Sequence, residues 1–175
     1  MAVTGAALRR EQVLESISHS KTPISASLLA NNLNVSRQVI VGDIALLRAQ
    51  GHEIIATARG YIVPEFRGSN QYIGKIVCKH DPKNTKSELY AIVDLGATVV
   101  NVIVEHELYG EITGQLNHKS REDVDIFISK VMSAEIRLLS ELTMGIHLHT
   151  IACRDKAHFE QVCQALDMEG YLIRD

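Results

Sequence analysis

The sequence predicts an α+β protein in two parts: a small helical N-terminal unit, and an α/β sandwich-like unit with helices on one face of a mixed or antiparallel sheet. Apolar residues recur at helical spacing through the first third of the chain. Residues 64–70 then combine Pro, Gly, Ser and Asn, as linkers do. Beyond them, expected strands and helices alternate around one hairpin, and no glycine-rich phosphate loop follows a strand, which favours α+β over a doubly wound nucleotide-binding fold. The predicted domains are 1–66 and 71–175.

The first part contains three predicted helices. The first ends near His19, before a Lys-Thr-Pro break. Ser25 and Ser36 can cap the second and third helices by accepting a hydrogen bond from a first-turn amide, and Gly51 ends the third. Their expected inward residues are Leu8, Val13, Leu14 and Ile17, then Leu28, Leu29 and Leu33, then Val39, Ile40, Ile44 and Leu47. The short connection between the last two helices predicts a helix-turn-helix, whose second helix presents its N-terminal residues to the major groove of DNA.

Two short strands at 52–57 and 60–63 then predict a hairpin that acts as a wing. Arg37 can bond guanine bidentately, and Gln38 can do the same with adenine. The residues expected to contact phosphate, which positions the protein without specifying a sequence, are Ser36, Arg48 and Arg59. Asp43 is expected to pair with Arg48 or a neighbouring loop. The alternative is a protein-interaction or dimerisation module built from the same three helices.

The second part has five predicted strands, at 72–80, 98–105, 109–116, 145–151 and 171–173, and three helices, at 85–95, 120–142 and 156–168. The helix at 120–142 is expected to be long and amphipathic. Its predicted inward residues are Val124, Phe127, Ile128, Val131 and Ile136.

Two imidazoles stand two residues apart in one of these strands, at His147 and His149. Side chains alternate along a strand, so both rings project from one face, while Ile146, Leu148 and Ile151 are expected to supply the core-facing alternation. Neutral histidine is the commonest transition-metal ligand, so the pair indicates a metal site. The alternative is two satisfied or solvent-exposed histidines on a half-buried strand.

His80 ends the first strand of this part, and Glu88 lies one turn into the next helix. With His147 and His149 they form a possible set of three histidines and one carboxylate. Such a set suits a divalent transition metal, zinc or nickel first and iron or manganese as well, and can leave a coordination position open. The sequence does not show that the four residues converge, and surface placement of His80 and Glu88 is the alternative.

Composition and charge limit the remaining possibilities. With 46% apolar and 22% charged residues, the chain has the composition of an ordinary globular protein. Lys and Arg outnumber Asp and Glu by seven to five through residue 67, and are outnumbered by sixteen to eleven after it, which fits a nucleic-acid-binding module joined to a different one. Three scattered cysteines without a C-x-x-C pair indicate buried thiols rather than a disulfide framework or zinc ribbon. No signal peptide or membrane-spanning run stands out, so a cytoplasmic protein without a membrane partner is expected.

Two groups of motifs resemble known domains. The stretch from Leu33 to Gly51, followed by Arg59-Gly60-Tyr61, resembles the winged helix of biotin-repressor-like regulators. The second part resembles the three-histidine (3H) domain, and the pairing of the two resembles the niacin-responsive repressors of the NiaR family. The matching stretches are Gly74-Lys-Ile-Val-Cys-Lys-His80, Glu88-Leu-Tyr, Asp94-Leu-Gly, Val104-Glu-His-Glu-Leu-Tyr-Gly-Glu-Ile112 and Gly145-Ile-His-Leu-His-Thr-Ile151.

This resemblance implies a repressor rather than an enzyme. Its metal ligands would be His80, Glu88, His147 and His149, with His106 near the effector. Repressors of this kind bind operator DNA of NAD-synthesis and niacin-uptake genes as homodimers when nicotinic acid is abundant. Two other functions remain open at this point: a regulator whose effector is the metal ion itself, and a metal-dependent enzyme fused to a DNA-binding domain, against which no general base stands out beyond the ligand candidates.

Overall fold

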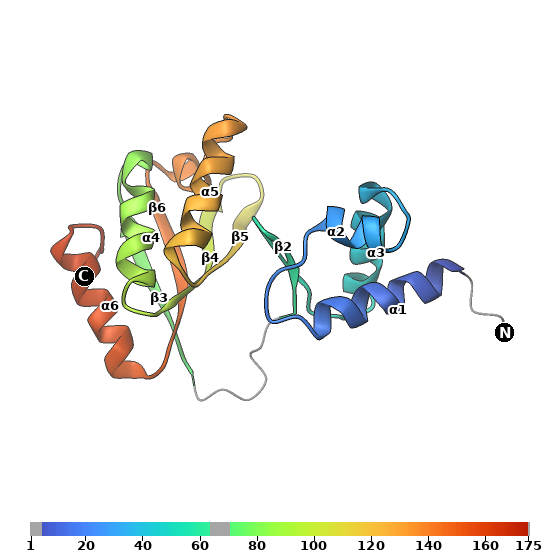
Figure 1. The fold of residues 1–175 in the computed structure, drawn as a ribbon. Coiled ribbons are helices and arrows are strands. Elements are labelled where there is room, and N and C mark those ends of the chain that lie inside the picture. Colours follow the sequence, from blue (N-terminus) through green and yellow to red (C-terminus); the bar gives the residue numbers. More distant parts are fainter. Residues whose placement is uncertain (1–4, 64–70, 175) are drawn as a thin grey trace. The chain divides into compact units, whose positions relative to one another are not determined.

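The computed structural model describes residues 5–63 and 71–174. The chain divides into two compact units, Met1–Gly68 and Ser69–Asp175, which are described separately below (Figure 1). The linker expected at 64–70 lies outside the described residues.

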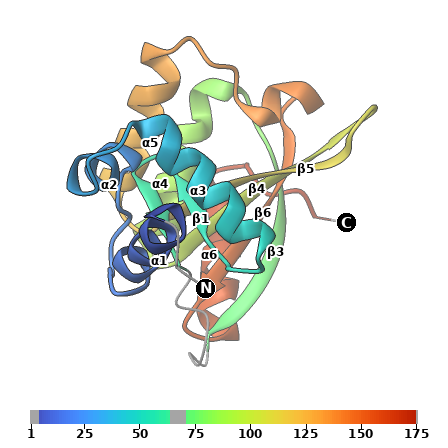
Figure 2. The ribbon, with the colours of Figure 1, turned by 90° about the vertical axis from the view of Figure 1, so that its right-hand side faces the viewer.

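The first unit consists of three helices and a hairpin. The helices are α1 (Gly5–Ser18), α2 (Ala26–Asn32) and α3 (Arg37–Ala49), and the hairpin pairs β1 (Ile55–Thr57) with β2 (Gly60–Ile62). Both predicted caps are present, because Ser25 accepts from the amide of Leu28 and Ser36 from that of Val39. Helix α3 packs against both α1 and α2 (Figure 2), so the three helices share one core.

The inward faces of these helices are narrower than predicted. Val13, Ile17, Leu29, Ile40, Ile44 and Leu47 are buried as expected. Leu8 and Leu28 are instead 51% exposed and Val39 is 37% exposed. Leu28 is rotated by about 100° from Leu29 around the helix, so the two side chains point in different directions. Val39 lies in the first turn of α3, and the buried residues of that helix begin at Ile40.

Gly60 fastens the hairpin to the loop before α2. Ile24 and Tyr61 exchange two backbone hydrogen bonds, with N–O distances of 2.9 and 2.8 Å. At Gly60, where φ is +143°, a Cβ atom would lie 2.2 Å from the carbonyl oxygen of Ile24. Only glycine lets the two backbones come this close, and the hydrogen bonds between Ile24 and Tyr61 then hold the hairpin against the helical core.

The second unit is a four-stranded antiparallel sheet with helices on one face. The strands are β3 (Tyr72–Lys79), β4 (Thr98–His106), β5 (Gly110–His118) and β6 (Ile146–Cys153), in the order β3-β6-β4-β5. Helices α4 (Thr85–Val93), α5 (Arg121–Ser133) and α6 (Lys156–Met168) lie over the same face (Figure 1) and share one buried core with it. Two short 3₁₀ helices, η1 (Pro82–Asn84) and η2 (Leu139–Thr143), complete the unit. The predicted α+β class is confirmed, and the sheet is antiparallel.

Two predicted elements of this unit were wrong. The helix expected at 120–142 ends at Ser133, since Glu135 adopts a left-handed φ of +49° and the chain turns back into η2. Ile136 is therefore 60% exposed, while Leu139 packs on Gly114 of β5 from a different direction. The strand expected at 171–173 is reduced to one bridge, between Leu172 and Cys78.

Candidate functional site

The N-terminus of α3 leaves its predicted DNA-reading side chains accessible. Ser36, Arg37 and Gln38 are all exposed. The Ser36 hydroxyl accepts from the amide of Val39 at 3.3 Å and keeps its own proton to donate. Arg59 is exposed at the turn of the hairpin. In a helix-turn-helix the N-terminal residues of the second helix meet the major groove, and the contacts of these four residues with bases or phosphates stay predictions.

The expected pairing of Asp43 with Arg48 was wrong. Asp43 is 3% exposed and accepts two hydrogen bonds from Arg9 of α1, at 2.6 and 3.2 Å. Asp43 lies on the side of α3 that packs against α1, which puts Arg9 rather than Arg48 within its reach. Arg48 Nε donates to the carbonyl of Ile54 at 2.8 Å, and its guanidinium lies over the ring of Tyr61. Arg48 thus links α3 to the hairpin, and its contact with phosphate stays a prediction.

In the second unit, His147 and His149 face the core of the protein. They are 2% and 3% exposed and share their face of β6 with fully buried Ile151. Ile146, which was expected to face the core, is 39% exposed on the opposite face. The prediction that both rings lie on one face of the strand is confirmed, but the prediction that this face points away from the core was wrong. The reason is a buried acid that compensates both rings.

That acid is Glu88, whose side chain is fully buried and meets three imidazoles. Oε2 of Glu88 lies 2.8 Å from Nε2 of His80 and 3.4 Å from Nε2 of His149. Nε2 of His147 lies 3.1 Å from Oε1 and 3.3 Å from Oε2 of the same carboxylate. The structure therefore brings together all four predicted metal ligands, from the end of β3, from α4 and from β6.

Each imidazole is held from behind by a backbone carbonyl. Nδ1 of His80 contacts the oxygen of Asp81 at 2.8 Å, and Nδ1 of His147 contacts that of Gly145 at 2.9 Å. Nδ1 of His149 lies 2.7 Å from the oxygen of Asn101. A carbonyl only accepts, so each Nδ1 carries the proton, and each Nε2 of a neutral ring presents a lone pair. This is the arrangement by which proteins orient histidines toward metals.

These lone pairs point at a carboxylate that is also an acceptor. Contacts of 2.8 to 3.4 Å between such atoms need a positive charge among them. Protonating all three rings would bury three positive charges around one negative charge, whereas one divalent cation satisfies every donor atom. Metal ligands held about 2.0–2.2 Å from one ion lie about 3.0–3.4 Å from each other. The distances from the three imidazoles to Glu88 are close to this range, and the ligand atoms of Glu88, His147 and Cys78 all lie within 4.8 Å of one another.

The charges of the cluster shift its acids and bases in opposite directions. Burial by itself would raise the pKa of Glu88, but the charge of His149 and hydrogen bonds from the imidazoles hold it well below its usual value. Burial by itself would lower the pKa of His80, but its hydrogen bond to Glu88, the charge of Glu88 and the contact with Asp81 together outweigh burial and raise the pKa. Both shifts describe the metal-free cluster, in which protons on the imidazoles would supply the positive charge that the Glu88 carboxylate needs, and a bound cation would replace those protons.

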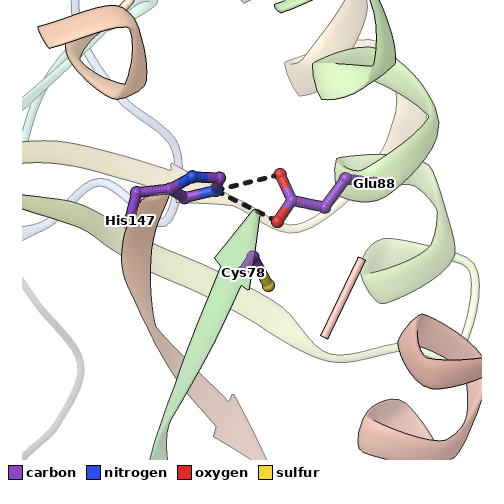
Figure 3. A group of neighbouring side chains, drawn as sticks. All are labelled: Cys78, Glu88 and His147. Carbon is purple, nitrogen blue, oxygen red and sulfur yellow. Dashed lines mark hydrogen bonds and ion pairs between the residues drawn. The ribbon is translucent and has the colours of Figure 1, made fainter. Parts of the chain in front are cut away.

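Cys78 is a member of the cluster that the sequence analysis missed. Its Sγ and the ligand atoms of Glu88 and His147 lie within 4.8 Å of one another (Figure 3). Burial and the nearby Glu88 carboxylate strongly raise the pKa of the Cys78 thiol. The signal was present in the alternation of β3, because Cys78 stands two residues before His80, and in the register, where Cys78 faces His147.

Gly145 sets the distance between the two strands that carry the ligands. It has a φ of +88°, and a Cβ atom there would lie 2.4 Å from the carbonyl oxygen of His80. The same residue supplies the carbonyl that orients His147. A glycine is needed here both for the backbone angle and for the close approach of His80.

A cavity of about 290 Å³ opens beside the cluster. Glu88, His147 and His149 line it, and most of its remaining wall is apolar. Thr85 also lines it, and its buried Oγ1 has no hydrogen-bond partner among the described residues. A buried hydroxyl without a partner indicates a place for a polar atom of a ligand or water.

The remaining histidines lie outside this cavity. Nδ1 of His106 accepts from the amides of Leu108 and Tyr109 in the turn after β4, and His106 does not line this cavity, so its place near the effector stays a prediction. His118 is 2% exposed, and its Nε2 has no partner among the described residues. His158 is buried and joins the carbonyl of Leu95 to the amide of Arg154.

The comparisons with known proteins agree with this organisation. Residues 9–62 match an HTH domain and residues 73–175 match the 3H domain. The chain is 43% identical over 169 residues to "Transcription repressor NadR" of Bacillus subtilis (strain 168), covering 95% of this chain and 94% of that protein. It is 40% identical over 168 residues to "Probable transcription repressor NiaR" of Thermotoga maritima, with the same coverage.

Identity at this level over nearly the whole chain establishes the family. Within the described ranges 5–63 and 71–174, no helix is long and apolar enough to cross a membrane. The relatives are named as transcription repressors, not as enzymes. The chain belongs to the NiaR family of transcription repressors, in which a DNA-binding helix-turn-helix domain precedes a 3H domain.

Proposed function

We propose that this protein represses genes of NAD synthesis and niacin uptake as a homodimer, with nicotinic acid as co-repressor. In this proposal His80, Glu88, His147 and His149 hold a divalent transition metal beside the effector. The observation that carries it is the set of three Nε2 lone pairs around one buried carboxylate, next to a small cavity. The choice of effector comes from the family resemblance.

The donor set supports zinc or nickel first, and iron or manganese as well. Imidazole nitrogens suit all four metals, and one carboxylate reduces the net charge of the site. Four protein ligands leave a further position open on a metal that takes five or six. When bound, the ion would act as a Lewis acid toward the pyridine nitrogen or the carboxylate of the effector.

The cavity supports a small, flat ligand. Its volume of about 290 Å³ is at the lower end of the range for small-molecule sites, about 300–1,000 Å³. Phe127, Leu89 and Val102 offer apolar contacts to an aromatic ring. A pyridine ring bearing one carboxylate has the two polar ends that such a site requires.

Co-repression requires that the effector bind one dimer geometry better than another. A helix-turn-helix dimer places its two recognition helices about 34 Å apart, in successive major grooves. Nicotinic acid shifts the population toward this spacing only if its affinity for that state is higher. The same difference then makes operator DNA raise the affinity for nicotinic acid by an equal factor, about 5- to 150-fold for a typical allosteric pair.

An operator titration tests the proposal. Labelled operator is titrated with metal-loaded protein at fixed salt, with and without nicotinic acid, and with and without added metal. We expect nicotinic acid to tighten operator binding of the wild type and to have no effect on His147→Ala, whose helix-turn-helix unit is intact. Equal operator affinity with and without saturating nicotinic acid would overturn the proposal.

The same titration identifies a metal-responsive regulator. The buried cluster, which needs a cation for its own electrostatic balance, is the observation that favours this second function. If metal alone tightens operator binding and nicotinic acid adds nothing, the ion is the effector.

A further inference from the structure

We infer that Arg137 is the anion anchor of this cavity and determines the preference for a carboxylate over a neutral amide on the effector. The inference rests on the proposed function, because it assigns a residue to the binding of the same small ring.

The cavity runs from the buried cluster to the surface. Its inner end is lined by Glu88, His147 and His149, which are 0%, 2% and 3% exposed. Ile136 and Arg137 also line it, and both are exposed. A ligand that reaches the cluster therefore has its other end at the segment that joins α5 to η2.

Among the described residues that line this cavity, Arg137 is the only Lys or Arg. The one acidic residue there, Glu88, already faces three imidazoles. In the described ranges 5–63 and 71–174, no carboxylate forms an ion pair with Arg137. The other surface arginine of this region, Arg121, is bound to Asp94 through two short hydrogen bonds. Arg137 keeps its full set of donors for an anion, and a guanidinium matches a carboxylate with two parallel bonds.

The backbone holds Arg137 at the mouth of the cavity. On one side, Glu135 has a φ of +49°, and the amide of Ile136 donates to the carbonyl of Val131 at 3.2 Å. On the other side, the amide of Leu138 donates to Oε1 of Glu141 at 2.8 Å. Residue 137 thus lies between two neighbours whose backbone amides are hydrogen-bonded.

The polar side chains of the cavity outside the metal cluster, Arg137 apart, do not discriminate an acid from an amide. Gln115 carries both a donor and an acceptor, so it bonds either ligand. The Thr85 hydroxyl can likewise donate or accept. Among the described side chains that line the cavity outside the metal cluster, only Arg137 carries the positive charge that prefers an anion, because a hydrogen bond between charged groups is about twice as strong as a neutral one.

Calorimetric titration of the metal-loaded full chain with nicotinic acid and with nicotinamide tests this role. We expect Arg137→Gln to weaken nicotinic acid binding about ten- to hundredfold and to leave nicotinamide binding unchanged. Arg137→Lys keeps the charge without the fork and should retain part of the preference. Lys130→Gln removes an exposed charge from α5 that does not line the cavity, and should behave as wild type.

Two further readouts separate an anchor from a structural residue. The metal content and the ligand-free melting temperature of Arg137→Gln should equal those of the wild type. Added salt should weaken nicotinic acid binding to the wild type more than to Arg137→Gln, since the pair lies near the surface. Unchanged nicotinic acid affinity in Arg137→Gln overturns the inference while the proposed function stands. Absence of nicotinic acid binding in the wild type overturns both.

Discussion

His147 Nε2 lies 3.1 and 3.3 Å from the two carboxylate oxygens of Glu88, a residue 59 positions earlier in the chain. Burying either side chain without the other would cost free energy, because a carboxylate and an imidazole each lose their hydration in the core. Together with His80 and His149 they form the site that we propose to hold a divalent cation.

We predict that purified protein binds about one divalent transition ion per chain, and that His147→Ala with His149→Ala abolishes stoichiometric binding, because two of four ligands are lost. Elemental analysis after dialysis measures the content. His106→Ala is the matched control, because His106 lies at a turn outside the cluster and should leave the metal content unchanged. Metal retained at full stoichiometry in the double variant would show that these histidines are not its ligands.

Gly145→Ala should destabilise the protein and weaken the metal site together. The change combines a left-handed backbone angle with a distance of only 2.4 Å between the new Cβ and the carbonyl oxygen of His80. Gly110→Ala is a close control, since Gly110 has a φ of +69° and nothing within 4 Å of a new Cβ. We expect the backbone angle to lower the free energy of unfolding of both variants by about 1 kcal/mol. The close contact should lower that of Gly145→Ala by about 1–3 kcal/mol more and weaken its metal binding.

Chemical denaturation and metal titration of the two variants measure the difference. Equal losses of stability, with metal affinity intact in both, would show that the approach of Gly145 to His80 does not hold the site.

The stability of the metal-free protein should fall as the pH is lowered from about 6.5 to 4, in part through His118. Burial lowers the pKa of His118 to about 4, whereas its pKa in the unfolded chain is about 6.5. In this window the unfolded state binds a proton that the folded state does not, so unfolding becomes more favourable by up to about 3 kcal/mol. Above pH 6.5 both forms are neutral and the effect is absent.

His118→Leu should remove this contribution. We expect the free energy of unfolding to depend on pH less steeply by about one bound proton between pH 6.5 and 4. His52→Leu, which replaces an exposed histidine, should leave the slope unchanged. Urea denaturation at several pH values, with a chelator present, measures both slopes. The same slope in His118→Leu and wild type would rule out His118 as the titrating group.

Arg37→Ala should weaken operator binding by about 1–3 kcal/mol and relax the preference at one base pair, as expected for the loss of a bidentate contact to guanine. Arg59→Ala should instead weaken operator and random DNA alike, because a phosphate contact carries no sequence information. Fluorescence anisotropy with operator, single-base variants and random duplex at one salt concentration distinguishes the two effects. Unchanged affinities for operator and random duplex in Arg37→Ala would refute the assignment of α3 as the recognition helix.

The sequence alone determined the features that depend on local spacing. The caps at Ser25 and Ser36, the strand at β4, the helix α6 and the shared face of His147 and His149 follow from short-range chemistry and alternation, and the structure has them all. The α+β class and the family were likewise accessible, since they depend on the order of such elements and on motifs. These features need no knowledge of which segments meet in space.

Only the tertiary structure decided which face of β6 is buried, what Asp43 pairs with, where the helix after Ser120 ends, and that Cys78 and Thr85 adjoin the cluster. Each depends on a partner distant in the sequence: Glu88 compensates the buried imidazoles, and Arg9 reaches Asp43 across a helix interface. The polarity of histidine favoured an exposed face. The buried carboxylate reverses that preference, because its charge and hydrogen bonds replace the stabilisation that water gives an exposed imidazole. Sequence spacing records where a side chain points along its own element, and packing decides what it meets there.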